Sequence, residues 1–204
     1  MSTQAKITKE IILQAAFEIA RVNGLEKVSN REIAKKINCS IRPIYYYFKN
    51  TEELNKELYK KIEKYFYKVI MEKVSDDIPP YKQIGINYIK FARNEKKLFQ
   101  ILFTTGNKNY FEDFIANDLE DYEKLTKIIK NTTKLSDEDI STFHIRMWIF
   151  SHGIATLVAN DTISLSDEQV RKLLSDEFQA LMLLEENKDN KWALKDKGEK
   201  IWKN

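Results

Sequence analysis

Apolar residues recur at three- and four-residue spacing along most of the chain, and short polar segments separate the periodic stretches. The pattern predicts amphipathic helices over residues 8–23, 29–37, 40–47 and 51–74. The segment DDIPP at residues 76–80 interrupts it, and we expect further helices around residues 84–91 and over 95–103, 110–131, 136–160 and 166–185. Glycine (5) and proline (3) are scarce, so the sequence predicts an all-α fold.

Capping residues mark the predicted helix boundaries. Thr8 is a candidate N-cap for the first helix, and Gly24 is suited to end it. The sequence SNRE at residues 29–32 is a capping box, and Asn50 with Glu53 begins the fourth helix in the same way. Asn38 can adopt the left-handed conformation, which leaves a turn of about three residues between the second and third helices. This arrangement is typical of a helix-turn-helix.

The third predicted helix carries three consecutive tyrosines behind an Arg-Pro pair, CSIRPIYYYFKN at residues 39–50. At ~100° per residue, one side of the helix is expected to be buried, formed by Ile41, Ile44 and Phe48. The opposite side is formed by Arg42, Pro43 and Tyr46, with Tyr45 and Tyr47 at its borders. Arginine, tyrosine and proline on an outward face suit the major groove of DNA. The alternative is that the tyrosines close the underside of a small domain.

The positive charge is concentrated in the same region. Residues 1–50 hold nine basic and four acidic side chains, whereas the other 25 of the 34 basic residues face 27 of the 31 acidic ones. The first fifty residues therefore carry +5 and the remainder −2, within a total of +3. A basic end on a nearly neutral body indicates an anionic partner, either nucleic acid or a membrane surface.

The sequence from residue 7 to residue 59 resembles the DNA-binding domain of the TetR family of bacterial transcriptional regulators. The resemblance rests on the Ala-Ala pair and Gly24 of the first helix, on S-x-R-x-I-A in the second, and on IYYYFKN-x-EEL leading into the fourth. It implies a DNA-binding domain at residues 1–50, a helical ligand-binding and dimerisation domain at 51–186 and a charged tail at 187–204. Asn38 stands where the family usually has the glycine of the turn.

The resemblance also implies which side chains meet DNA. They lie at the start of the second helix, along the third and at the start of the fourth. Base or phosphate contacts are expected from Ser29, Asn30, Arg31, Ile41, Arg42, Pro43, Tyr45, Tyr46, Tyr47, Lys49 and Thr51. By the same resemblance, a homodimer binds a pseudo-palindromic operator, and a small-molecule inducer shifts the recognition helices away from the ~34 Å spacing of one DNA turn.

The body resembles one of the family's recurring ligand-binding domains, with a Trp…His-Gly element at Trp148, His152 and Gly153. Aromatic residues at helical spacing are the candidate pocket wall, although such residues are more often core. The candidates are Phe91, Phe99, Phe103, Phe111, Phe114, Trp148 and His152, with Tyr88 and Met147 farther out.

The apolar stripes of the helices over 136–160 and 166–185 predict a four-helix dimer interface. On the first helix the stripe contains Ile149, Ile154, Leu157 and Val158. On the second it contains Val170, Leu173, Leu174, Phe178, Leu181 and Met182. The alternative is that both stripes pack only within one chain.

Other functions find little support in the sequence. His144 and His152 are ~80° out of register on one helix, with no cysteine or carboxylate cluster beside them, so we expect no metal site and no cofactor. Catalytic motifs are absent, and we expect no enzyme. With one cysteine, no apolar run in MSTQAKITKE and no membrane span, a cytoplasmic protein is expected. Two alternatives to a ligand-responsive repressor remain: the same DNA reader controlled by a protein partner, or a helical enzyme that retains the fold.

Overall fold

The computed structural model describes residues 7–73, 75–103 and 119–186. All the regular elements in these ranges are helical, which confirms the predicted all-α fold. They are α1 (Lys9–Asn23), the short 3-10 helix η1 (Leu25–Lys27), α2 (Asn30–Lys36), α3 (Arg42–Tyr47), α4 (Thr51–Ile70), α5 (Pro80–Asn94), α6 (Lys96–Phe103), α8 (Leu119–Thr133), α9 (Asp137–Ala159) and α10 (Asp167–Glu186). Phe111, Phe114, the first half of the helix expected over 110–131 and the tail at 187–204 lie outside the described residues.

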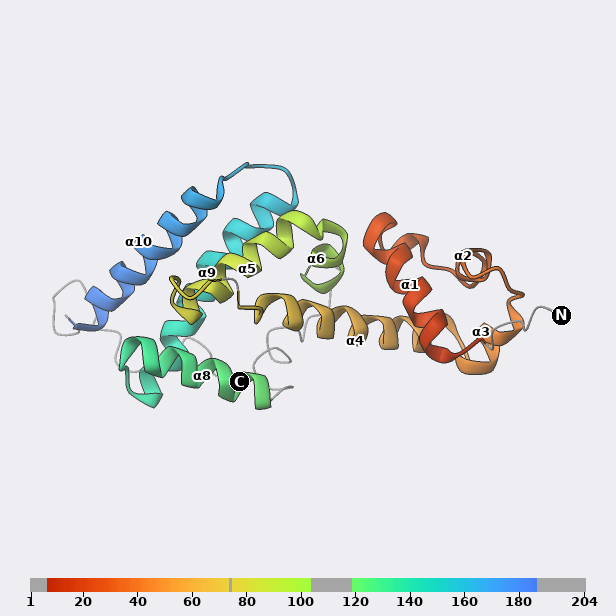
Figure 1. Ribbon diagram of the computed structural model, residues 1–204, viewed down its shortest axis with the longest axis horizontal. Helices are drawn as coiled ribbons and strands as arrows, with labels where there is room; N and C mark the ends of the chain where they lie inside the picture. The colour runs from red at the N-terminus through yellow and green to blue at the C-terminus, as the bar shows by residue number, and fades with distance from the viewer. Residues whose placement is uncertain (1–6, 74, 104–118, 187–204) are drawn as a thin grey trace.

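The molecule is elongated, with α1, α2 and α3 gathered at one end (Figure 1). Helix α4 leaves this end and runs into a body that contains α5, α6, α8, α9 and α10. Within the body, α5 packs extensively against α9 and also contacts α10 and α8. Helix α4 therefore belongs to both ends of the molecule, and α6 of the body also packs against α1.

The capping residues act as the sequence predicts. The side-chain oxygens of Thr8, Ser29 and Asn50 each accept a hydrogen bond from the backbone N–H three residues later, at 3.3, 3.2 and 2.8 Å. Gly24 and Asn38 have positive φ angles of 88° and 51°, so they end α1 and form the turn after α2. Local chemistry thus sets these boundaries.

Two boundaries differ from the prediction. Helix α3 begins at Arg42, two residues later than expected. Helix α4 ends at Ile70, because the buried amide of Asn87 donates hydrogen bonds to the carbonyls of Ile70 (3.2 Å) and Glu72 (2.8 Å). These carbonyls would otherwise need partners from a longer helix, and a residue on a different helix supplies them.

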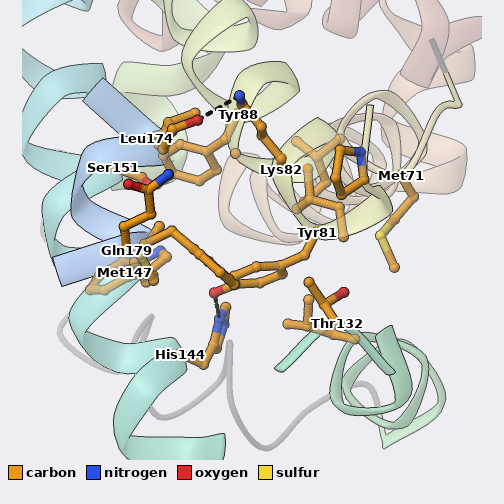
Figure 2. Close-up of a pocket in the computed structure, with 18 of the residues that line it drawn as sticks. Met71, Tyr81, Lys82, Tyr88, Thr132, His144, Met147, Ser151, Leu174 and Gln179 are labelled. Carbon is orange, nitrogen blue, oxygen red and sulfur yellow. Dashed lines mark hydrogen bonds between the residues drawn. The ribbon is translucent and has the colours of Figure 1, made fainter. Parts of the chain in front are cut away.

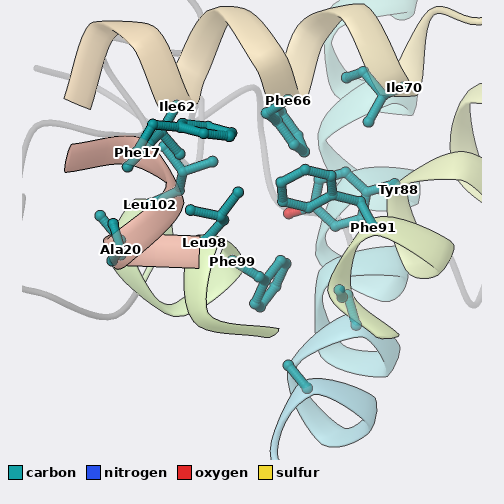
Figure 3. Close-up of a cluster of buried hydrophobic side chains, with 14 of the residues drawn as sticks. Phe17, Ala20, Ile62, Phe66, Ile70, Tyr88, Phe91, Leu98, Phe99 and Leu102 are labelled. Atoms are coloured by element: carbon teal, nitrogen blue, oxygen red, sulfur yellow. The ribbon is translucent and has the colours of Figure 1, made fainter. Parts of the chain in front are cut away.

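An aromatic cluster joins the body to the end of the molecule that contains α1, α2 and α3. Phe66 of α4 is fully buried, and its ring meets those of Tyr88 and Phe91 edge-on at 5.6 and 5.1 Å. Figure 3 shows this cluster continuing through α6 to Phe17 on α1. Edge-to-face contacts of this kind fix ring orientation as well as burying area, so the core provides a continuous packed connection between α1 and α5.

Candidate functional site

The third helix presents a polar and aromatic face to solvent. Tyr46 is 81% exposed and Tyr45 is 55% exposed, and Arg42 is exposed beside them. On the other side Ile44 (0%) and Phe48 (2%) are buried. The predicted division of this helix is confirmed for these residues.

Ile41 and Tyr47 differ from the simple helical wheel. Ile41 was expected on the buried side, and this is wrong: it is 42% exposed. It precedes the first helical residue, so the helical period does not set the direction of its side chain. Tyr47 is half-buried, and its hydroxyl donates to the Ile7 carbonyl at 3.3 Å. Tyr47 therefore fastens the end of α3 to the segment before α1.

The predicted DNA-contacting residues share one end of the molecule and are largely accessible. Exposed side chains are Ser29, Arg31, Ile41, Arg42, Tyr45, Tyr46, Lys49 and Thr51, and half-buried ones are Asn30, Pro43 and Tyr47. In the described part of the chain, Arg31, Arg42 and Lys49 form no ion pair. Cations without a carboxylate partner are free to neutralise phosphates, so this end has the charge and accessibility that DNA binding requires.

Ion pairs hold the helix-turn-helix against the rest of the molecule. Arg21 on α1 donates from its Nε to Glu95 Oε2 at 2.8 Å and from its Nη2 to Oε1, and the Tyr65 hydroxyl donates to the same carboxylate at 3.1 Å. Hydrogen bonding to Glu95 raises the pKa of Arg21. Glu95 is 8% exposed and lies at the junction of α5 and α6. These contacts therefore connect α1 directly to the junction of α5 and α6.

A cavity of about 270 Å³ lies in the body. Its wall includes Tyr67 and Ile70 from α4, Leu125 from α8, Met147 from α9 and Leu174 from α10. Figure 2 shows side chains of these helices and of α5 converging on it. The cavity is thus formed where the helices of the body meet, and the last turns of α4 form part of its wall.

Two tyrosine–histidine pairs connect α5 to α9. The Tyr81 hydroxyl lies 3.0 Å from His144 Nδ1, and the Tyr88 hydroxyl lies 2.8 Å from His152 Nδ1. Burial raises the pKa of both tyrosines, lowers the pKa of His152 and lowers the pKa of His144 to about 4. Both histidines are consequently neutral at pH 7. Tyr81, Tyr88 and His144 line the cavity.

The cavity wall overlaps only partly with the residues expected from sequence. Trp148, Tyr88 and Met147 belong to it, whereas Phe91, Phe99, Phe103 and His152 are not among its lining residues. Phe99 and Phe103 pack together with ring centroids 4.6 Å apart. His152 stacks on Trp148 at 4.9 Å, so these side chains form the aromatic core next to the cavity.

The apolar stripes of α9 and α10 each divide between interior and surface. Ile154, Val158, Val170, Leu174 and Leu181 are buried within the chain, and Leu173, Phe178 and Met182 are half-buried. In contrast, Ile149 is 49% exposed and Leu157 is 42% exposed. Gly153 lies between them on the same face, where an added Cβ would have no atom within 4 Å. This face of α9 is open, apolar and able to approach another backbone closely.

Metal-ligating side chains do not gather in the described ranges, where no group of three or more histidine, cysteine, aspartate or glutamate residues could hold an ion. Across residues 7–73, 75–103 and 119–186, no helix is long and apolar enough to cross a membrane.

Some residues of the site carry no recognisable sequence signal. Lys82, Ser175 and Gln179 line the cavity, yet each occupies a position that a sequence pattern assigns to an ordinary polar helix face. The spacing of Tyr81 and Tyr88 with His144 and His152 was the available signal. Seven residues on one helix and eight on the other bring two like pairs together only when the helices pack side by side.

Residues 12–58 match the family model of bacterial regulatory proteins of the tetR family. Comparison with curated protein sequences finds no match.

Solved structures share the overall fold at low identity. A TetR family protein from Vibrio parahaemolyticus is 18% identical, with a TM-score of 0.64 over 84% of this chain and 96% of its own. A TetR-family regulator from Haemophilus influenzae RD is 20% identical, with a TM-score of 0.60 over 84% and 94%. The Q116A variant of TetR from Acinetobacter baumannii AYE, in complex with minocycline, is 12% identical, with a TM-score of 0.54 over 89% and 98%.

Proposed function

We propose that the protein is a ligand-responsive repressor, because residues 12–58 match the family model of tetR-family regulatory proteins and the chain shares its fold with solved TetR-family regulators. A homodimer binds a pseudo-palindromic operator, and a small molecule in the body releases it. Residues 1–50 form the reading domain, and 51–186 form the domain that binds the ligand and the second copy.

The shared helix α4 is the observation that carries this proposal. It packs against α1 beside α2 and α3, and Tyr67 and Ile70 near its end line the cavity. A ligand that displaces these side chains moves the helix on which the reading domain is mounted. The two binding sites then bias one element with two positions, which is the physical requirement for allosteric coupling.

At the reading end, Arg42 and Tyr46 are the candidates for contact with base edges, because both are exposed on the free face of α3. Ser29, Lys49 and Thr51 lie at helix starts or beside them, which suits phosphate contacts. Tyr47 has a hydroxyl already bonded to Ile7, so its contribution is to hold α3 in position.

The cavity supports control by a small molecule over control by a protein partner. A volume of about 270 Å³ approaches the range of roughly 300–1,000 Å³ that is usual for ligand sites. The Acinetobacter baumannii relative has the same fold and contains minocycline. A filled core without a cavity would instead have favoured a partner protein.

The open face of α9 supports the homodimer. Ile149, Gly153 and Leu157 follow one another at four-residue spacing, and Leu183 and Leu184 are exposed near the end of α10. Pairing of α9 and α10 across a two-fold axis would cover these side chains and place two copies of α3 on one side of the dimer. The operator then contains two half-sites, about 34 Å apart when they are separated by one DNA turn.

The test is binding of the full chain to the DNA beside its own gene. We expect a complex whose affinity falls steeply as salt rises, because binding releases counterions from the phosphates. Competition with unrelated DNA of the same length separates specific from general binding. Absence of a salt-sensitive complex at that DNA contradicts the proposal.

A further inference from the structure

Among the described residues, a single charged side chain lines the cavity in the body. Lys82 of α5 lines it, and its Nζ donates to the Ser175 hydroxyl of α10 at 2.6 Å. Among the described residues no carboxylate pairs with Lys82, and no aspartate or glutamate lines the cavity. The other lysine and arginine of the same helix, Lys90 and Arg93, both pair with Asp167. Lys82 thus carries a charge that no described carboxylate neutralises.

The rest of the wall is mostly apolar. Ile70, Met71, Leu125, Met147 and Leu174 supply aliphatic and thioether surface, and Tyr88 supplies an aromatic edge. Figure 2 places the Lys82 amine near one end of the drawn side chains and the Tyr81–His144 pair at the other. A ligand that fills this space therefore needs an apolar body with its charge at one end.

The Tyr81–His144 pair in the wall adds no charge. The Tyr81 hydroxyl has the His144 Nδ1 as its partner, and the buried His144 Nε2 has none in the described part of the chain. Because burial keeps this imidazole neutral, it contributes a hydrogen bond and leaves Lys82 as the one cation in the described wall. One cation matches one negative charge.

We propose that the ligand of this cavity is a small monocarboxylic acid with an apolar body, whose carboxylate binds the Lys82 amine and the Ser175 hydroxyl. This inference rests on the proposed function and adds the chemical class of the ligand. In the free protein Ser175 accepts from Lys82, so its own proton is available to a carboxylate oxygen. The lysine and the serine then give the carboxylate two donors from two helices, α5 and α10.

Other charge types fit the wall less well. An amine would place a second cation beside Lys82 with no carboxylate to receive it. A phosphate dianion would bring two negative charges to one lysine, and no arginine among the described lining residues adds a second cation. A neutral alcohol can bond the same groups, but it lacks the negative charge that would make an ion pair with the Lys82 amine.

The experiment compares head groups on matched bodies. The probes are phenylacetate, phenylethanol and phenylethylamine, together with octanoate, octanol and octylamine. Each is titrated by calorimetry into the full chain in the absence of DNA. In at least one of the two sets we expect the acid to bind about tenfold more tightly than the alcohol, and the amine to bind most weakly, since only the acid forms an ion pair with Lys82.

Variants locate the effect. Lys82→Met removes the charge and keeps most of the length of the side chain. Acid affinity should therefore fall about tenfold or more, and alcohol affinity should fall by less, because the alcohol has no ion pair to lose. Lys90→Met is the matched control on the same helix. It removes a lysine whose Nζ lies 3.1 Å from Asp167 Oδ2 and which does not line the cavity, and the preference for the acid should survive.

Three results overturn the ligand class: an alcohol or amine that binds as tightly as its acid in both sets, an acid preference that persists in Lys82→Met, or no binding by either acid. None of these results bears on operator binding, which is measured separately on the ligand-free chain. If an acid binds as expected and the operator complex is unaffected, the ligand class stands and the proposed mode of regulation fails.

Discussion

Helices α3 and α5 both carry tyrosines, and their surroundings give these tyrosines different tasks. Tyr46 on α3 is 81% exposed, whereas Tyr88 on α5 is 4% exposed and has its hydroxyl 2.8 Å from a histidine nitrogen. A buried hydroxyl requires a hydrogen-bond partner within the protein, whereas an exposed hydroxyl can bond to water or to a bound molecule. The exposed face of α3 thus leaves its tyrosine hydroxyls accessible. In the body, tyrosine hydroxyls instead connect α5 to α9 beside the cavity.

The largest expected effect is on the free energy of unfolding, which should respond very differently to the loss of Tyr88 and of Tyr46. Tyr88→Ala removes a buried ring that contacts Phe66 and Phe99, and it should lower the free energy of unfolding by about 3–5 kcal/mol, as for other buried aromatic side chains. Tyr46→Ala should change it by less than about 0.5 kcal/mol, because that ring is at the surface. Urea unfolding at one fixed protein concentration measures both. Equal losses would remove the contrast.

The next effect is on DNA binding, and it compares two cations of the helix-turn-helix end, Arg42 and Lys49. Arg42→Ala should weaken specific operator binding by about 1–3 kcal/mol and relax the preference at one base position. Lys49→Ala should weaken binding to all DNA about equally and flatten the salt dependence by roughly one phosphate contact. Fluorescence anisotropy on operator and unrelated duplexes distinguishes these outcomes. Unchanged operator affinity in Arg42→Ala would mean that the exposed face of α3 is not the reading face.

The pH dependence of stability tests the burial of His144 in the body. The pKa of His144 is about 4 in the folded chain and 6.5 as its ordinary value, so the unfolded chain binds more protons between these two values. Stability is therefore lost as the pH falls below about 6.5, and about 2 kcal/mol of it should be gone at pH 5.

The control for the acid experiment is His144→Gln. This variant starts less stable at pH 7, because Tyr81 loses its imidazole partner, but it should lose less further stability on going to pH 5. Chemical unfolding at the two pH values gives the comparison. An identical pH response in the wild type and His144→Gln would show that the imidazole is not held neutral by the fold.

The smallest effect concerns neighbouring tyrosines on α3. Tyr47→Phe removes the hydrogen bond to the Ile7 carbonyl and should cost about 0.5–1.5 kcal/mol of stability. Tyr46→Phe should cost nothing measurable, since its hydroxyl is on the exposed face. Thermal unfolding of the two variants is sufficient to compare them. A larger loss in Tyr46→Phe would reverse the roles assigned to the two residues.

Features set by local chemistry could be predicted from the sequence. Ser29 and Asn50 cap their helices, Asn38 turns the chain, and Ile44 and Phe48 face inward because a short helix has one buried side. The predicted burial of Ile41 was wrong because the helix was expected to start two residues earlier than α3 does. A helical wheel applies only to residues within the helix.

The cavity depended on information that a single helix does not contain. Phe99 and Trp148 look alike as apolar positions, but only Trp148 lies on the wall, because the wall is set by the meeting of α4, α5, α8, α9 and α10. The same holds for α9, whose apolar residues are divided between the core and an open face by the packing of α5 against it. Long-range packing also ended α4 early, through Asn87.

The most direct test of the account is the affinity of the full chain for its operator with and without a saturating acid probe, at a concentration where calorimetry shows the cavity to be filled. We expect the acid to weaken operator binding by about 5- to 150-fold, the usual range for coupled sites. Lys82→Met should bind the operator normally and lose this response. The same operator affinity with the cavity filled and empty would contradict the claim that α4 couples the two ends.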